Sequence, residues 1–203
     1  MTTPKGERRR QQLIEAAALL LAEGGFDAVR HRAVAERAGL PLASTTYYFD
    51  SLDELITATV EHSSRADLAA GRAVLEGLDS GAQGVGTVVE VMLERLLGSP
   101  KEEDDFHAVL LRYEQLVATG RRPYLRPLMR RLGAEFDALL GEILTHCGMP
   151  LPPAEVKRLV ALVDGTVVSA LLEVDPDPRS AARRALAGEL ARQVNRTRGS
   201  STA

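Results

Sequence analysis

The segment from Gly39 to Leu55 constrains the fold of this chain more than any other part of the sequence. It reads Gly-Leu-Pro-Leu-Ala-Ser-Thr-Thr-Tyr-Tyr-Phe-Asp-Ser-Leu-Asp-Glu-Leu, a glycine turn followed by small, hydroxylated and then aromatic residues. The whole chain has four Tyr, four Phe and no Trp, so the run Tyr47-Tyr48-Phe49 concentrates its aromatic side chains. This run is too apolar for a free loop, and its tyrosines are too polar for a core alone. The segment therefore predicts a short helix with one packed side and one side that meets a partner.

The rest of the sequence also predicts helices, because Ala, Leu, Glu and Arg dominate and strand-like alternation is absent. In the first predicted helix, apolar residues from Leu13 to Leu21 recur at helical spacing and form one stripe. We predict an all-α fold of about nine helices. They cover approximately residues 8–23, 30–38, 42–49, 53–75, 85–97, 102–118, 123–146 (kinked at Pro127), 154–174 and 178–196.

Glycines and one capping pair mark the limits of the N-terminal helices. Gly24-Gly25 and Gly39 are predicted to end the first and second helices, since glycine adopts the left-handed conformation at little cost. Ser51, followed three residues later by Glu54, has the spacing of a capping box and predicts the start of a long fourth helix. Three short helices with a glycine turn before the third have the proportions of a helix-turn-helix. We therefore predict a DNA-binding domain at residues 1–52, a larger helical ligand-binding and dimerisation domain at 53–196, and a disordered tail at 197–203.

Composition indicates a folded protein of a reducing compartment. The single cysteine, Cys147, cannot form an intramolecular disulfide. We find no signal peptide and no stretch of about 20 apolar residues, so we expect a cytoplasmic protein without a membrane span. The net charge is −3, but residues 1–49 carry +2 and the remainder −5. A basic end on an acidic body favours a localised contact with phosphates.

The third predicted helix has the chemistry of a helix that reads the major groove of DNA. Ala43 and Ser44 are small and allow close approach, while Ser44 and Thr46 can form hydrogen bonds with base edges. The hydroxyls of Tyr47 and Tyr48 can contact phosphates, which orients the helix without reading sequence. Thr45 and Phe49 are then expected to face inward. The alternative is that the aromatic run belongs to the core of a helical bundle.

From Arg10 to Leu55 the sequence resembles the tetracycline-repressor (TetR) family of bacterial regulators. The residues that carry the resemblance are Ala16-Ala17, Gly25-Phe26, Arg32, Val34-Ala35, Ala38-Gly39-Leu40, Tyr47, Phe49 and Asp53-Glu54-Leu55. The resemblance implies that Arg32 reaches a base or a phosphate from the second helix, with His31 beside it near the phosphates. Three positions depart from the family pattern, because Val29-Arg30 lacks the usual cap of the second helix, Pro41 replaces Ser and Leu52 replaces Lys.

The resemblance also implies a homodimer formed through the last two helices. Gly165, Ser169 and Ala170 are small enough to let helices approach closely, although the same residues are compatible with a contact inside one chain. A ligand pocket is further implied among the helices between Val85 and His146. Its candidate lining residues are Met92, Leu96, Phe106, His107, Leu110, Tyr113, Glu114 and Phe136.

These observations predict a homodimeric transcriptional regulator that is not an enzyme and needs no cofactor or metal. We expect a repressor that releases a palindromic operator when a small apolar or amphipathic effector binds. An enzyme is the first alternative, but His146 and Cys147 are adjacent and diverge by about 100° on a helix. An architectural DNA-binding protein without sequence preference is the second. The run Arg8-Arg9-Arg10 is either a solvated helix end or an arm that contacts phosphates or the minor groove.

Overall fold

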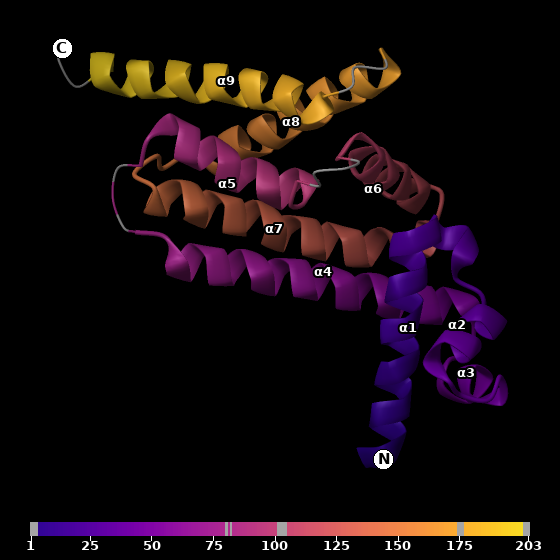
Figure 1. Cartoon of the computed structure of the whole chain (residues 1–203). Helices are drawn as coiled ribbons and strands as arrows, with labels where there is room; N and C mark the ends of the chain where they lie inside the picture. The colour runs from indigo at the N-terminus through magenta and orange to yellow at the C-terminus, as the bar shows by residue number, and fades with distance from the viewer. Residues whose placement is uncertain (1–3, 80, 82, 101–104, 174–176, 201–203) are drawn as a thin grey trace. The chain divides into compact units, whose positions relative to one another are not determined.

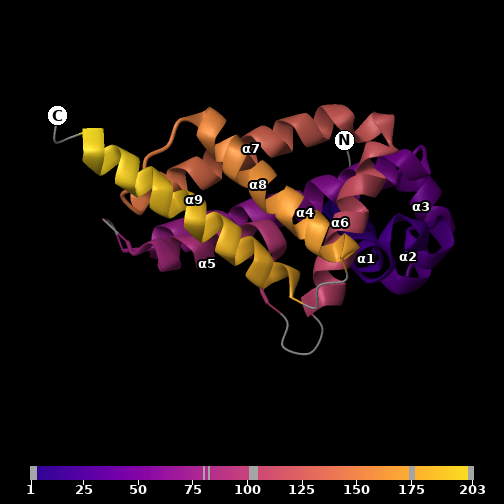
Figure 2. The ribbon, with the colours of Figure 1, turned by 90° about the horizontal axis from the view of Figure 1, so that it is seen from above.

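The computed structural model describes residues 4–79, 81, 83–100, 105–173 and 177–200, and every regular element in these ranges is a helix. The all-α prediction is therefore confirmed for these residues. Figures 1 and 2 show the helices from two directions. They are α1 (Pro4–Ala28), α2 (His31–Ala38), α3 (Ala43–Tyr48), α4 (Leu52–Gly77), α5 (Val85–Leu97), α6 (Asp105–Gly120), the 3₁₀ helix η1 (Pro123–Leu125), α7 (Arg126–His146), α8 (Pro153–Leu172) and α9 (Pro178–Ser200). None of these described helices has the length and apolar character that crossing a membrane requires.

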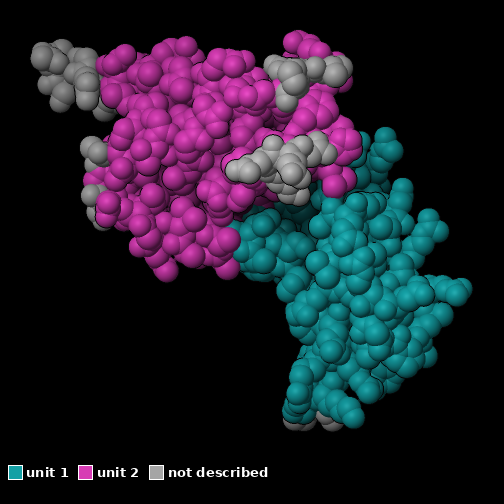
Figure 3. Space-filling view, in the orientation of Figure 1, with its two compact units in different colours: residues 1–67, 114–132 teal, residues 68–113, 133–203 magenta. Residues whose placement is uncertain are grey.

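The chain forms two compact units, which Figure 3 colours separately. Unit 1 comprises residues 1–67 and 114–132, and unit 2 comprises residues 68–113 and 133–203. Unit 1 thus contains the predicted domain at 1–52 and adds the first part of α4 and the segment around η1. Within unit 1, the Gln115 side chain donates a hydrogen bond to the Leu21 carbonyl (2.8 Å), and Arg131 pairs with Glu61 (2.6 Å). These contacts join residues 114–132 to the N-terminal helices.

The predicted break at Gly24-Gly25 is a kink inside α1. Gly25 has φ 66° and ψ −165°, a combination that is essentially restricted to glycine. The helix resumes and places Phe26 in the core of unit 1 at 8% exposure. The guanidinium of Arg122 lies over the Phe26 ring, 3.8 Å from its centroid. The glycine pair therefore redirects the chain, so that Phe26 can pack.

The two other N-terminal signals act as the sequence predicts. Gly39 ends α2 in the left-handed conformation (φ 64°), and its N–H donates to the carbonyls of Ala35 and Glu36. At the start of α4, the Glu54 N–H donates to Ser51 Oγ (3.1 Å). The Glu54 carboxylate in turn accepts a hydrogen bond from the Asp50 N–H (2.7 Å). The predicted capping pair is confirmed, with its return bond displaced by one residue from Ser51 to Asp50.

In unit 2, α9 packs on α8 and on α5 around an aliphatic core. The fully buried large side chains of this core are Met92, Leu93, Leu139, Leu140, Ile143, Leu144, Leu159 and Leu186. The predicted kink at Pro127 is wrong, because Pro127 lies in the first turn of α7, where a missing N–H breaks no helical hydrogen bond. The helix α9 extends to Ser200, so residues 197–200 of the predicted tail are helical; residues 201–203 lie outside the described residues.

Candidate nucleic-acid interface

The inner side of α3 is anchored in the core of unit 1. Thr45 is 0% exposed and Phe49, the residue that caps α3, is 1% exposed. The Thr45 hydroxyl donates to the Leu42 carbonyl (2.8 Å), so this buried polar group is satisfied. Behind Phe49, the Arg10 guanidinium of α1 lies 5.0 Å from the ring centroid, within the range of a cation–π contact. Both inward orientations predicted from the sequence are confirmed.

The outer side of α3 carries the residues predicted to read DNA. Tyr47 is 79% exposed, and Ala43 and Thr46 are also exposed. Ser44 and Tyr48 are half-buried at the edge of this surface. The Tyr47 and Tyr48 rings meet edge to face with centroids 4.9 Å apart, which limits the directions their hydroxyls can take. The outer side of α3 therefore presents hydroxyl groups to solvent, while the inner side is fixed by packing in the core of unit 1.

The start of α2 supplies the second predicted element. Arg32 is exposed, whereas His31 is half-buried and its Nδ1 has no hydrogen-bond partner among the described residues. No side chain caps α2, because Arg30 at the N-cap position has no acceptor to offer the first-turn N–H groups. Its Nε instead donates a hydrogen bond to the Asp27 carbonyl (3.0 Å). The first-turn N–H groups of α2 are thus not occupied by a capping side chain, as the departure at Val29-Arg30 predicts. Such groups can bind a phosphate oxygen.

An ion pair fixes α2 against α1. Two nitrogens of Arg37 bind the two carboxylate oxygens of Glu23, one of them at 2.9 Å. The hydrogen bond from Arg37 lowers the pKa of the Glu23 carboxyl, so the pair is charged at neutral pH. Both side chains are largely exposed, and the pair therefore orients the helices more than it stabilises the fold.

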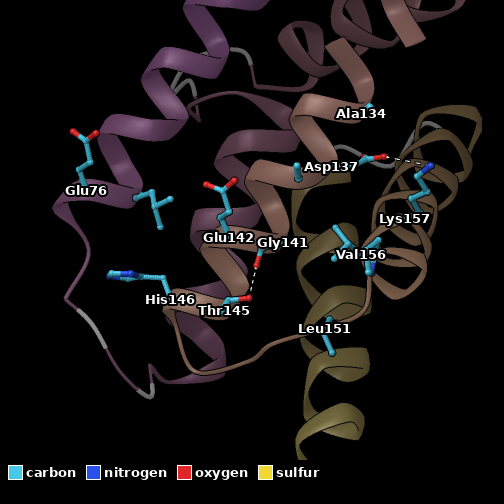
Figure 4. Close-up of a pocket in the computed structure, with 13 residues that line it drawn as sticks. Glu76, Ala134, Asp137, Gly141, Glu142, Thr145, His146, Leu151, Val156 and Lys157 are labelled. Carbon is cyan, nitrogen blue, oxygen red and sulfur yellow. Dashed lines mark hydrogen bonds and ion pairs between the residues drawn. The ribbon is translucent and has the colours of Figure 1, made fainter. Parts of the chain in front are cut away.

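Unit 2 contains a pocket of about 930 Å³ between the end of α4, the outer face of α7 and the start of α8 (Figure 4). Three small residues of α7, Ala134, Ala138 and Gly141, line it at helical spacing. The other lining residues are Leu75, Glu76, Asp137, Glu142, Thr145, His146, Leu151, Pro153, Val156 and Lys157, and Asp137 pairs with Lys157 at 3.9 Å. Sequence reasoning missed this pocket, although the spacing of small residues on α7 was visible.

The ligand residues predicted from the sequence lie elsewhere, and none of them lines this pocket. Met92 and Leu96 are buried on α5, and Phe136 is half-buried on α7. The other five residues lie on α6. Among these, Tyr113 is buried and donates a hydrogen bond to the Asp164 carboxylate of α8 (2.8 Å). Burial, followed by the charge of Asp164, raises the pKa of Tyr113 far above its usual range. His107 and Glu114 are exposed.

The helix α8 presents an apolar stripe to solvent. Val168 is 41% exposed and Leu172 is 79% exposed, although both are large hydrophobic residues. Gly165 and Ser169 lie exposed in the same stripe, and nothing lies within 4 Å of a Cβ added at Gly165. Ala170 points the other way and is buried at 5% exposure. Of the three small residues noted in the sequence, two are therefore available to a partner helix.

Comparisons with known proteins place these features in a family context. A family model described as bacterial regulatory proteins, tetR family, matches residues 13–59, and one described as tetracyclin repressor-like, C-terminal domain, matches residues 83–192. The solved structure of the multidrug binding protein EbrR complexed with imidazole is 33% identical, with a TM-score of 0.62 over 90% of this chain and 94% of that chain. EbrR complexed with ethidium is 32% identical, with a TM-score of 0.62 over 90% and 97%. A TetR family member from Streptomyces coelicolor A3 is 32% identical, with a TM-score of 0.56 over 90% and 97%. A search of the curated proteins found no match.

Proposed function

This chain belongs to the tetR family of bacterial regulatory proteins, whose members are transcription regulators rather than enzymes, and we propose that it is a cytoplasmic homodimeric repressor. In this proposal the repressor binds a palindromic operator and releases it when a small molecule binds to unit 2. The observation that carries the proposal is the division of α3 into a buried side and an exposed side. Thr45 and Phe49 hold the helix, and Tyr47 extends into solvent at 79% exposure.

The proposed reading head consists of α3 and the start of α2. Ser44 and Thr46 form hydrogen bonds with base edges in the major groove, and Ala43 allows the α3 backbone to approach. The two tyrosine hydroxyls and Arg32 bind phosphates and set the orientation of the helix. His31 lies at the same end of α2 and contacts the backbone of the duplex.

The proposed dimer forms through α8 and α9. The exposed stripe that contains Val168 and Leu172 supports it, because apolar side chains of this size gain free energy when a second copy covers them. The small residues Gly165 and Ser169 let the two copies of α8 approach closely. Two reading heads about 34–36 Å apart then bind successive major grooves, and the second contact gains from the first.

The proposed effector is a small apolar or amphipathic molecule. The relative EbrR has been solved with imidazole and with ethidium, and ethidium is a flat aromatic cation. For this chain two locations are consistent with such a ligand. One is the predicted set on α5, α6 and α7, where Tyr113 and Asp164 form a buried polar pair. The other is the pocket of Figure 4, where Glu76 and Glu142 supply negative charge.

Coupling between ligand and operator requires only a modest free energy. The helix α4 runs from Leu52 in unit 1 to Gly77 in unit 2, so a ligand that displaces its second half also displaces the reading head. A reduction of operator affinity by a factor of ten to a hundred corresponds to about 1.4–2.7 kcal/mol of coupling. The ligand supplies this through its different affinities for the two states.

The operator is first identified by selecting bound fragments from genomic DNA, and binding is then measured by fluorescence anisotropy. We expect Tyr48→Ala and Arg32→Ala to weaken operator binding at least tenfold. Arg126→Ala removes another exposed arginine of unit 1 and should bind like the parent. If both reading-head variants bind like the parent, the assignment of the head is wrong. Selection that yields no preferred sequence would instead favour an architectural protein.

The dimer and the effector need separate measurements. Sedimentation of Leu172→Asp should give a monomer, while Leu116→Asp, at another exposed leucine (47%), should remain dimeric. A dimeric Leu172→Asp variant would exclude the α8 interface. The binding of ethidium to the parent and to two variants is measured by calorimetric titration without DNA. Weaker binding by Tyr113→Phe would place the ligand among the predicted residues of α5 to α7, and weaker binding by Glu142→Gln would place it in the pocket of Figure 4. Parent-like ethidium binding by both variants would exclude both locations.

A further inference from the structure

The N-terminal turns of α1 bury no side chain in the core of unit 1. The helix begins at Pro4, but its first buried residue is Leu13, so residues 4–12 contribute no buried side chain. We call residues 4–12 the basic arm. Lys5, Arg8 and Arg9 of the arm are exposed, and none of the three forms an ion pair within the described part of the chain. Three long cations thus extend into solvent on an ordered helix.

The three cations share one face of the arm. Because an α-helix turns by roughly 100° per residue, Lys5, Arg8 and Arg9 fall within an arc of about 100°. Glu7 lies roughly 150° from the middle of that arc and does not neutralise it. A helix end that is only solvated has no need to keep its cations on one face and its carboxylate on the other, whereas a helix that contacts a polyanion does.

Arg10 connects the arm to the reading head. Its side chain turns away from the cationic face and places its guanidinium 5.0 Å from the centroid of Phe49. Phe49 is the C-terminal cap of α3, so the C-terminal part of the arm, at Arg10, lies beside the end of α3 that carries Tyr47 and Tyr48. Within unit 1, Figure 1 shows the arm continuing past the level of α3. Nine helical residues add about 13 Å to the reach of unit 1 on this side.

We propose that the basic arm is a second DNA-binding element, which lies as a helix against the phosphate backbone beside the groove occupied by α3. This inference rests on the proposed function of α3. The arm contacts the backbone and not the minor groove, because a helix with its side chains is about 10–12 Å wide and the minor groove of B-DNA is about 6 Å wide. Its contribution is therefore electrostatic and independent of sequence.

The proposal is tested with the triple variant Lys5→Gln, Arg8→Gln, Arg9→Gln. Glutamine has a helix propensity close to that of Lys and Arg, so the arm stays helical while its charge is removed. Each lost phosphate contact makes the plot of log K against log salt less steep by about 0.9. A dimer carries two arms, and loss of every contact lowers the slope by about 5. Anisotropy titrations between 50 and 200 mM salt measure this difference.

The matched control removes three exposed arginines of unit 1 outside the arm, with Arg121→Gln, Arg126→Gln and Arg130→Gln. Both triples change the net charge equally, so only the position of the charges differs. We expect the arm variant to lose affinity by the same factor on the operator and on a random duplex, and the control to retain the parent slope. Circular dichroism of both variants checks that helix content is unchanged.

Three outcomes would overturn the proposal. The first is an arm variant whose salt slope lies within about 1 of the parent. The second is an equal loss of slope in the control triple, which would indicate net charge alone. The third is a loss on the operator without a loss on the random duplex, which would indicate base reading. Titration on a random duplex at 50 mM salt tests the arm even if no operator exists, and failure of the proposed function is thus separable from failure of this inference.

Discussion

Truncating two aromatic residues of the α3 segment should separate folding from DNA binding. Phe49 is 1% exposed, and its replacement by Ala removes a fully buried ring and leaves a cavity. Such changes cost about 3–5 kcal/mol, and the lost cation–π contact with half-exposed Arg10 adds about 0.5 kcal/mol. We therefore expect Phe49→Ala to lower the free energy of unfolding by roughly 4 kcal/mol.

Tyr47→Ala is the matched change on the opposite side of the same helix. Tyr47 is 79% exposed, and its main contact is the edge-to-face pair with Tyr48. Loss of that pair at an exposed site costs about 0.5–1 kcal/mol. The two truncations should therefore differ by about 3 kcal/mol in stability, although both remove an aromatic ring. For operator binding we expect the opposite order: Tyr47→Ala should weaken binding more than Phe49→Ala, because it removes the phosphate contact that we propose for Tyr47.

Urea unfolding followed by circular dichroism, at one fixed protomer concentration, measures the two stabilities. Anisotropy at a temperature where each variant is folded measures operator binding. The reasoning is refuted if Tyr47→Ala destabilises the protein as much as Phe49→Ala does. It is also refuted if Tyr47→Ala binds the operator with parent affinity.

Four further predictions concern single measurements. Arg179→Met removes the two hydrogen bonds that the guanidinium donates to the Asp105 carboxylate (2.7 and 2.8 Å), and it should lower the free energy of unfolding in urea by about 3 kcal/mol. Burial raises the pKa of the Cys147 thiol, so a maleimide should label native protein far more slowly than urea-unfolded protein. The hydrogen bond from Arg37 lowers the pKa of Glu23, so the folded state binds fewer protons at this carboxyl than the unfolded state does. The stability that this pair contributes is therefore complete above about pH 4.5, the ordinary pKa of Glu, and is lost as the pH falls through the lowered pKa of the folded state. Glu23→Gln should thus make the free energy of unfolding fall less steeply with decreasing pH in the acid range. The Phe49 amide, which donates to the Thr45 carbonyl (3.0 Å), should keep its hydrogen-exchange protection when effector binds.

Local sequence signals were sufficient for most of the helix limits. The predicted helix at 85–97 coincides with α5, and Gly39 and Ser51 act as the sequence indicates, because capping depends on residues within one turn. The start of α1 was placed four residues late, since no apolar residue marks the basic arm. The inward turn of Phe49 was predictable because this aromatic residue, unlike Tyr47 and Tyr48 beside it, has no hydroxyl group and gains only from packing.

Features built from distant segments were not predictable in the same way. The pair of Arg179 with Asp105 joins residues 74 positions apart, and neither residue has a local pattern that reveals the other. The pocket of Figure 4 combines the end of α4, one face of α7 and the start of α8. The small residues on α7 were visible in the sequence, but only tertiary packing shows that none of the described helices covers them. Sequence reasoning placed the ligand residues by resemblance instead, among the helices between Val85 and His146.

The energetics of α3 decide how an effector can act on the reading head. A helix of six residues has no stability of its own, because nucleation of an isolated helix is unfavourable. Its structure therefore depends on buried Thr45 and Phe49, on the Arg10 contact and on the capping pair that starts α4. Melting α3 would forfeit roughly 4 kcal/mol at Phe49 alone. This loss is about 1–3 kcal/mol larger than the coupling free energy of 1.4–2.7 kcal/mol that a useful induction factor requires. We therefore expect an effector with this coupling energy to leave α3 folded, so that the proposed release of the operator comes from displacement of an intact head.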